Sequence, residues 1–183
     1  MIAALVLSFA AAAGPASGEI AFVGGSEGAP DRVHVLTLDT RSLRDVGPEG
    51  ASGAPAWSPN GHQLAFAVRD GDASRIYIAD VTGANGRFLD HAQALNRGPV
   101  WSLEGDRIAY TAGSGLDAQI MVAASKGGAE NAWGGGRTSL MNPIWIEQAL
   151  VDLIFERLSG DGAKSFLPPI LSGQRAPSVI LAV

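Results

Sequence analysis

The chain has 183 residues, 46% of them hydrophobic and 17% charged, a composition that favours a folded core over intrinsic disorder. Its net charge of −5, without a cluster of basic residues, argues against nucleic acid or an acidic lipid surface as its partner. The absence of cysteine excludes disulfide bonds, thiolate metal sites and cysteine nucleophiles, and the 24 glycines indicate a chain that turns often.

The chain begins with an apolar segment, residues 1–17, which has two interpretations. Its first thirteen residues are apolar apart from Ser8, and small residues follow, as in a secretory signal. No basic residue precedes Arg32, however, so a buried strand of the mature fold remains open as the alternative. The segment is shorter than the roughly 20 residues that cross a bilayer, so we predict no transmembrane span. We favour export to the periplasm or another extracytoplasmic compartment.

Internal repetition is the strongest signal in the sequence. The segments 54–68, 98–112 and 142–156 align, and a further shift by the same period aligns residues 11–22 with residues 55–66. Trp57, Trp101 and Trp145 mark the period, because neighbouring members of this series are 44 residues apart. The other repeated positions are Pro55, Pro99 and Pro143, with Phe66 and Tyr110.

A second set of segments alternates between apolar and polar residues, which indicates half-buried strands. These segments are 32–39, 75–80 and 119–124, and glycine-rich turns flank them. A 44-residue unit of short antiparallel strands is typical of a propeller blade. We therefore predict an all-β protein, a β-propeller-like array of about three to four antiparallel blades, as a complete or an incomplete ring.

The second repeat resembles the TolB-type propeller repeat. Its segments APAWSPNGHQLAF and RIYIADVTGANGRFL carry the proline, the Trp-Ser-Pro turn and the Ile-Tyr-x-x-Asp strand of that repeat. The third repeat keeps Trp101 and Ser102 but has Leu103 for the proline, and the first repeat lacks the tryptophan. The resemblance covers residues 18–156 and implies the fold. It leaves function open, since the repeat serves periplasmic scaffolds, sensors, sugar-binding proteins and gating domains of prolyl-oligopeptidase-type enzymes.

The repeated residues also have a structural interpretation of their own. Residues 58–61, Ser-Pro-Asn-Gly, suit a tight turn because proline presets φ and Asn-Gly tolerates positive φ. Trp57 precedes this turn, and we expect it to pack between blades rather than to stack on a ligand. Asp80 follows a predicted strand, and we expect it to cap the next turn.

We assign residues 18–164 to the blades and residues 165–183 to an apolar tail or closing strand. This length predicts fewer than four full blades, so a closed four-bladed ring, an open arc, a truncated copy and an assembly completed by another chain all remain possible. Residues 147–158 could form an amphipathic helix, but the phase of Trp145 favours a strand over residues 151–155. We expect the tail to contact a partner. The candidate contact residues are Phe166, Leu167, Ile170, Leu171, Val179, Ile180 and Leu181.

The search for catalytic and metal-binding motifs gives little. Residues 24–28 match the G-x-S-x-G nucleophile elbow at Ser26, but that motif must open a helix, and here another strand follows. The three histidines lack metal-ligand spacing. Asp70 and Asp72 flank a glycine and fit a hairpin turn better than a Ca²⁺ loop. We predict no catalytic residue, metal site or cofactor, and a protein that is not an enzyme.

The predicted function is that of a non-enzymatic extracytoplasmic binding or scaffold subunit. It would dock on other protein subunits and stabilise a larger membrane-associated complex of transport, of the envelope, or of photosynthesis or respiration. One alternative is a substrate-binding or gating propeller that works with a separate hydrolase. The other is a periplasmic propeller that binds a small ligand.

Overall fold

The computed structural model describes residues 6–7, 18–89, 95–128, 130–133, 139–145, 153–158 and 164–167. In these residues the strands form four antiparallel sheets, each built from consecutive strands. The first sheet holds β1 (Val6–Leu7), β2 (Glu19–Gly24), β3 (Arg32–Thr37) and β4 (Ser42–Val46). The second holds β5 (Ala51–Trp57), β6 (Gln63–Asp70), β7 (Ala73–Asp80) and β8 (Arg87–Phe88).

The third sheet holds β9 (Asn96–Trp101), β10 (Arg107–Ala112), β11 (Gln119–Ala124) and β12 (Glu130–Trp133), with the short 3₁₀-helix η1 (Gly115–Asp117) between β10 and β11. The fourth holds β13 (Ser139–Trp145), β14 (Leu153–Leu158) and β15 (Lys164–Leu167). Among the residues described, no helix is long and apolar enough to span a membrane.

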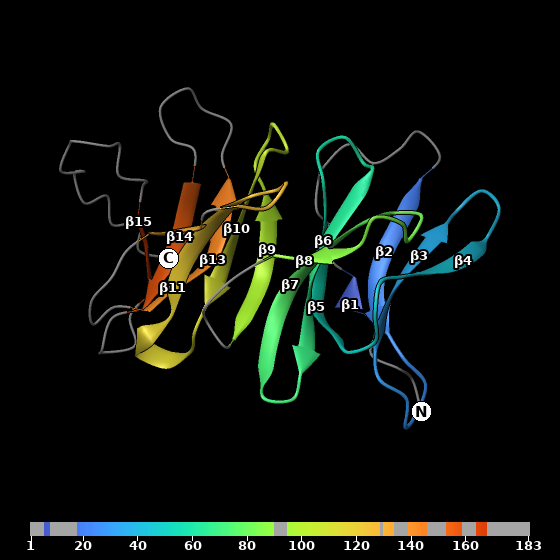
Figure 1. The fold of residues 1–183 in the computed structure, drawn as a ribbon, viewed down its shortest axis with the longest axis horizontal. Coiled ribbons are helices and arrows are strands. Elements are labelled where there is room, and N and C mark those ends of the chain that lie inside the picture. The colour runs from blue at the N-terminus through green and yellow to red at the C-terminus, as the bar shows by residue number, and fades with distance from the viewer. Residues whose placement is uncertain are drawn as a thin grey trace.

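The four sheets follow one another along the long axis of the molecule, with the first and the fourth at opposite ends (Figure 1). The second, third and fourth sheets meet through their first strands, since β5 contacts β9 and β9 contacts β13, and the first sheet meets the second where β2 contacts β5. This is an array of propeller blades, as the 44-residue period predicts. Over the described residues it is an open arc rather than a closed ring.

Residues 6–7 form the short strand β1, in which Val6 pairs with Val23 and Leu7 pairs with Phe22. This is the place that β5, β9 and β13 take in their own sheets.

The three repeat tryptophans end the first strands of their sheets. Trp57 pairs with Leu64, Trp101 with Ile108 and Trp145 with Leu153. Residues 153–158 form β14, so the strand interpretation of this region is confirmed. The register differs by one residue from the expected one, because an unbroken period puts Asp152 rather than Leu153 opposite Trp145. One more residue therefore separates the first two strands of the fourth sheet.

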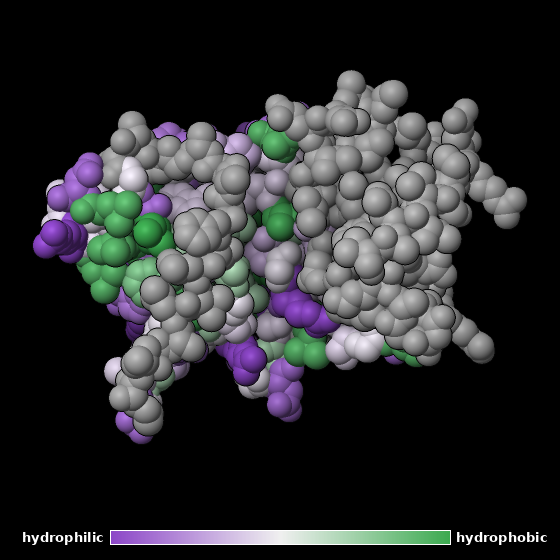
Figure 2. Space-filling view, turned by 180° about the vertical axis from the view of Figure 1, so that it is seen from behind, coloured by the Kyte–Doolittle hydropathy of each residue, from purple (hydrophilic) through white to green (hydrophobic). Residues whose placement is uncertain are grey.

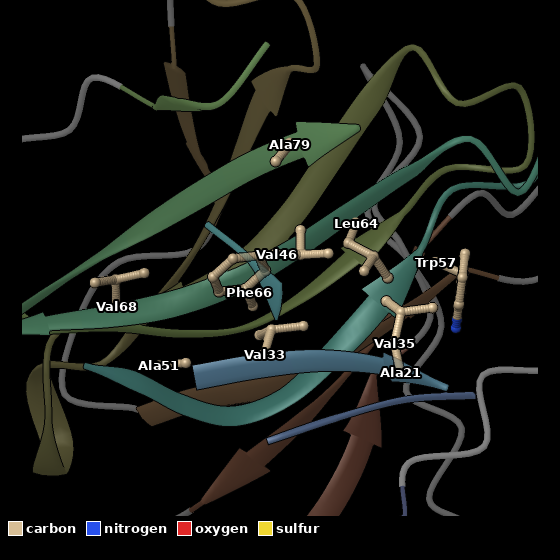
Figure 3. Close-up of a cluster of buried hydrophobic side chains, with 10 residues drawn as sticks. All are labelled: Ala21, Val33, Val35, Val46, Ala51, Trp57, Leu64, Phe66, Val68 and Ala79. Atoms are coloured by element: carbon tan, nitrogen blue, oxygen red, sulfur yellow. The ribbon is translucent and has the colours of Figure 1, made fainter. Parts of the chain in front are cut away.

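The core lies between neighbouring sheets. Between the first and second sheets, Val33 and Val35 face Leu64 and Phe66, and all four side chains are fully buried (Figure 3). Each buried side chain of this size contributes about 1.5–3 kcal/mol to stability. A second cluster joins the second sheet to the third. It comprises Ala65, Ala67, Ile76, Ile78, Leu89, Trp101, Ile108, Tyr110, Ala112 and Ala123.

The two faces of a blade differ in the size of their side chains, because successive residues of a strand point to opposite faces. The face that meets the next blade carries small or β-branched residues, such as Ala65 and Ile76 in the second sheet. The face that meets the preceding blade carries aromatic residues beside an aliphatic one, as Phe66, Tyr77 and Phe88 do beside Leu64 in the second sheet. The aromatic ring of one blade therefore packs on the small residues of the blade before it.

Candidate functional site

The serine of the Trp-Ser turn makes similar hydrogen bonds in the second and third blades, although its side-chain acceptor lies two residues after the serine in one and four residues after it in the other. In the second blade the Ser58 hydroxyl accepts from the amide of Gln63 at 2.9 Å and donates to Oδ1 of Asn60. In the third blade the Ser102 hydroxyl accepts from the amide of Arg107 at 3.0 Å and donates to Oδ1 of Asp106. These buried hydroxyls fix the turn, so its repetition within the chain has a structural cause.

The repeated positions pack rather than bind. Trp57 and Trp101 are 8% and 7% exposed, and the indole N–H of Trp101 donates to the carbonyl of Ala56 at 3.1 Å. The repeat prolines and aromatics are buried as well: Pro55, Pro99, Pro143, Phe66 and Tyr110. The prolines sit where the first strand bulges against the second, which suits a residue without an amide hydrogen. Trp145 ends β13.

The Asp80 carboxylate holds the turn after β7, as the sequence indicates. It accepts from the side-chain amides of Gln63 at 3.0 Å and Asn85 at 2.6 Å. These hydrogen bonds lower the pKa of Asp80 below its usual value. Burial raises the pKa of the Tyr110 hydroxyl, and the nearby Glu130 raises it further. Neither group is arranged for catalysis.

The nucleophile-elbow motif does not form an elbow. Gly24 ends β2, and the chain passes Ser26 in an exposed turn and enters β3 without a helix. His34 is the nearest histidine in the sequence, and both of its ring nitrogens have partners. Nδ1 lies 2.8 Å from Asp45 and Nε2 lies 3.1 Å from the carbonyl of Gly24. No ring nitrogen of His34 is therefore left to activate Ser26.

Two adjacent hollows form a groove at the end of the blades where β5 and β9 begin. One hollow of about 540 Å³ extends from Gly24 and Asp31 to Arg69. The other, of about 490 Å³, extends from Arg69 past Ser74 to Arg97. Both are lined by Ser52, Gly53 and Arg69, so they join. We call this feature the end groove; it is lined by residues 23–25, 30–31, 50–53, 69, 71–74, 95 and 97.

Main-chain hydrogen bonds fix the floor of the end groove. The amides of Gly50 and Ala51 both donate to the carbonyl of Asp31, at 2.8 and 3.0 Å, which ties the second blade to the first. Ser74 ties the second blade to the third, since its hydroxyl donates to the carbonyl of Asn96 and accepts from the Asn96 amide. The groove is therefore preformed by backbone contacts between blades.

Glycine backbone and charged side chains are the groups that a ligand in the end groove would contact. Gly53 has φ of +72° and open space where a side chain would stand, so its backbone is accessible from the groove. The exposed Arg69 stands where the two hollows join, and the guanidinium of Arg97 donates to the carbonyl of Gly113 at 2.7 Å. The groove offers backbone groups and side chains of both charges, because Asp31 and Asp72 line it together with Arg69 and Arg97. Among the described residues no cluster of His, Asp or Glu could hold a metal ion.

The end groove has no signal in the sequence. Its residues come from separate strands and match no motif, and Asp72 was considered only as part of a hairpin turn. Of the predicted partner contacts, Phe166 and Leu167 lie in β15, which pairs with β14. The others lie outside the described residues: Ile170, Leu171, Val179, Ile180 and Leu181.

Comparison with known proteins agrees with this architecture. The family model described as the TolB beta propeller domain matches residues 4–157. No curated protein sequence matches the chain. A structure assigned as TolB from Agrobacterium tumefaciens is similar at 18% identity with a TM-score of 0.64, over 78% of this chain and 51% of that one.

Two further solved structures are similar. One is a puromycin-hydrolyzing peptidase of Mycobacterium tuberculosis, at 18% identity and a TM-score of 0.70, over 92% of this chain and 28% of the peptidase. The other belongs to a nidogen/laminin complex, at 16% identity and a TM-score of 0.57, over 83% of this chain and 61% of that one. At these identities the likeness shows the fold alone. The chain spans about half to three fifths of the first structures it matches.

Proposed function

Because the chain belongs to the TolB β-propeller family, we propose that it is a protein-binding module which holds an extended segment of a partner in the end groove. The observation that carries this proposal is the continuity of the groove across the starts of β5 and β9 through Ser52, Gly53 and Arg69. Each hollow has the volume of an ordinary ligand pocket, roughly 300–1,000 Å³, and together they suit a ligand longer than a small molecule.

The chemistry of the groove selects the partner segment. Accessible backbone at Gly53 and Gly71 can pair with the main chain of an extended peptide, as exposed strand ends do in other peptide-binding domains. Arg69 and Arg97 favour acidic side chains or a terminal carboxylate, to which guanidinium groups bind with charge-assisted hydrogen bonds. Arg69 lines both hollows, whereas Asp31 and Asp72 each line one of them. We therefore expect a segment of a partner protein that places an acidic residue where the two hollows join.

We further propose that the module acts on the extracytoplasmic side, as a non-enzymatic subunit of a membrane-associated complex. The family supports this, because TolB-type repeats serve periplasmic scaffolds. The alternative, a gating propeller that works with a separate hydrolase, is favoured by the peptidase structure that is similar over 92% of this chain. Mixing the chain with a candidate hydrolase distinguishes the scaffold function from the gating function. A gating propeller changes the size range of the peptides that the hydrolase cleaves, and a scaffold does not.

Affinity capture from native membranes, followed by measurement of binding to the captured protein, tests the groove. Arg69→Glu should weaken binding at least about tenfold, because it replaces an attraction by a repulsion. Lys126→Glu is the matched control, since Lys126 is exposed in the turn after β11, at the opposite end of the blades. Equal binding by both variants would contradict the proposal.

A further inference from the structure

His34 uses both of its ring nitrogens within the first sheet. Nδ1 lies 2.8 Å from a carboxylate oxygen of Asp45 in β4, and Nε2 lies 3.1 Å from the main-chain carbonyl of Gly24 at the end of β2. An ionised carboxylate and a carbonyl can only accept hydrogen bonds, so both ring nitrogens must donate. An imidazole with a proton on each nitrogen carries a positive charge. The geometry around His34 is therefore that of an imidazolium.

The charged groups that face His34 come from three places. Asp45 comes from β4, Arg32 lies two residues earlier on the same face of β3, and Glu49 follows β4. Arg32 is paired with Glu49 at 2.5 Å, so Asp45 balances the charge of His34. β2 contributes the ring of Phe22, whose centroid lies 5.4 Å from that of the imidazole. Figure 2 shows the first sheet at the left, where hydrophilic and hydrophobic residues adjoin.

The carbonyl that Nε2 binds belongs to the wall of the end groove. Gly24 and Gly25 line one of the two hollows of the groove. Gly25 packs closely on Asp31, since a Cβ on this glycine would lie 2.8 Å from a carboxylate oxygen of Asp31. The carbonyl of Asp31 in turn accepts from the amides of Gly50 and Ala51 on the groove floor. The end of β2 is thus joined to the groove floor through the loop that begins at Gly25.

We propose that His34 is a positioning residue of the end groove, which holds the end of β2 in place only while its imidazole is protonated. Histidine side chains change charge between about pH 5 and about pH 8. When one proton is lost, the remaining N–H stays with the carboxylate of Asp45, because hydrogen bonds to an ionised group are the stronger ones. The lone pair of Nε2 then faces the carbonyl of Gly24. The groove is therefore fully formed at acidic pH, and its wall loosens at alkaline pH.

This inference concerns the regulation of the end groove, and its consequence for partner binding rests on the function proposed for that groove. The hydrogen bonds that carry it join groups of the first sheet to one another. They are therefore made whatever else packs on that sheet.

Nuclear magnetic resonance of the full 183-residue chain, with ¹⁵N-labelled histidine, tests the protonation of His34. His34→Gln identifies the signals of this ring by their loss. At about pH 5 both ring nitrogens should carry protons, and at about pH 8 the proton should remain on Nδ1 and leave Nε2. A neutral ring with its proton on Nε2 would contradict the proposal. So would ring-nitrogen signals that are the same at both pH values.

Hydrogen exchange of the Gly50 amide tests the coupling to the groove, because this amide donates to the carbonyl of Asp31 at 2.8 Å. The reference is the amide of Gly105, which donates to the carbonyl of Ser102 at 2.9 Å in a turn at the opposite end of the blades. After correction for the intrinsic effect of pH on exchange, the protection of Gly50 relative to Gly105 should fall about tenfold or more between about pH 5 and about pH 8. This is the factor that a hydrogen bond to a charged group contributes. An unchanged ratio overturns the inference.

Three variants separate His34 from other titrating groups. His34→Gln has no ring to titrate, so the ratio should no longer change with pH. His62→Gln is the matched control and should behave as the wild type, since His62 is exposed in the turn between β5 and β6. Asp45→Asn should move the change to lower pH, because a carboxylate stabilises a neighbouring imidazolium. A pH dependence that persists in His34→Gln overturns the inference, and the wild-type measurements decide the test if a variant does not fold.

The results also distinguish this inference from the function proposed for the groove. If Arg69→Glu weakens partner binding but the protection of Gly50 does not change with pH, the function stands and the inference about His34 is wrong. If the protection of Gly50 changes but Arg69→Glu and Lys126→Glu bind the captured protein equally, the inference stands and the function is wrong. Where both stand, the captured protein should bind more weakly at about pH 8 than at about pH 5, and His34→Gln should remove this difference.

Discussion

Truncation of Trp101 to alanine is the most direct probe of the contact between blades. The indole lies between the second and third sheets, 7% exposed, and its N–H donates to the carbonyl of Ala56. The substitution therefore removes a large apolar side chain from the interface between the blades. It also leaves the carbonyl of Ala56, in a strand of the neighbouring blade, without this hydrogen-bond donor.

The expected loss follows from burial. A tryptophan buries about 150–250 Å², and at about 25 cal/mol per Å² this corresponds to about 4–6 kcal/mol, an upper value because unfolded chains are partly compact. Measured truncations of large aromatic residues cost about 3–5 kcal/mol. The carbonyl of Ala56 is only half-buried, so water replaces part of the lost hydrogen bond. We expect Trp101→Ala to lower the free energy of unfolding by about 3–5 kcal/mol.

Urea denaturation followed by circular dichroism measures this change. Trp101→Phe keeps most of the ring and loses the donor, so it should lower the free energy of unfolding by only about 1–2 kcal/mol. Leu103→Ala, two residues away and exposed, is the surface control and should lower it by less than about 0.5 kcal/mol. A loss below about 1 kcal/mol for Trp101→Ala would show that the blades do not pack through this indole.

Two further predictions concern the stability of the blades. Gly47 has φ of +77°, and a Cβ there would lie 2.7 Å from Cζ of Phe66, so Gly47→Ala should lower the free energy of unfolding by about 2–5 kcal/mol. Gly127 has φ of +88° and open space around it, so Gly127→Ala should lower the free energy of unfolding by only the cost of the backbone conformation, about 1–2 kcal/mol. Equal losses of stability in the two variants would refute the clash with Phe66. The hydrogen bond from the Ser102 hydroxyl lowers the pKa of Asp106 below 3.8. A lowered carboxylate pKa stabilises the fold above pH 3.8, and this contribution disappears as the pH falls through the folded-state pKa. When the pH is lowered, the stability of Asp106→Asn should therefore fall by less than that of the wild type. The same dependence of stability on pH in both proteins would refute the role of this hydrogen bond.

The fold could be predicted because blade contacts repeat. Trp57 and Trp101 are buried between blades at the ends of β5 and β9, and Trp145 ends β13 in the same 44-residue phase, which composition alone does not show. The turn after Trp57 and Trp101 repeats as well, since its buried serine bonds the chain on both sides. The register of β14 could not be predicted in the same way. A loop tolerates an extra residue at little cost, and hydrophobic periodicity alone does not record it.

The end groove could not be predicted, because no single segment builds it. Ser52, Arg69 and Arg97 come from β5, β6 and β9, and they meet only after the blades have packed. The residues that stand out in the sequence lie elsewhere. Trp57 and Trp101 are buried in the core, and Ser26 is in an exposed turn. A strong repeat signal reports the scaffold, and the binding surface depends on loops and strand starts that differ from blade to blade.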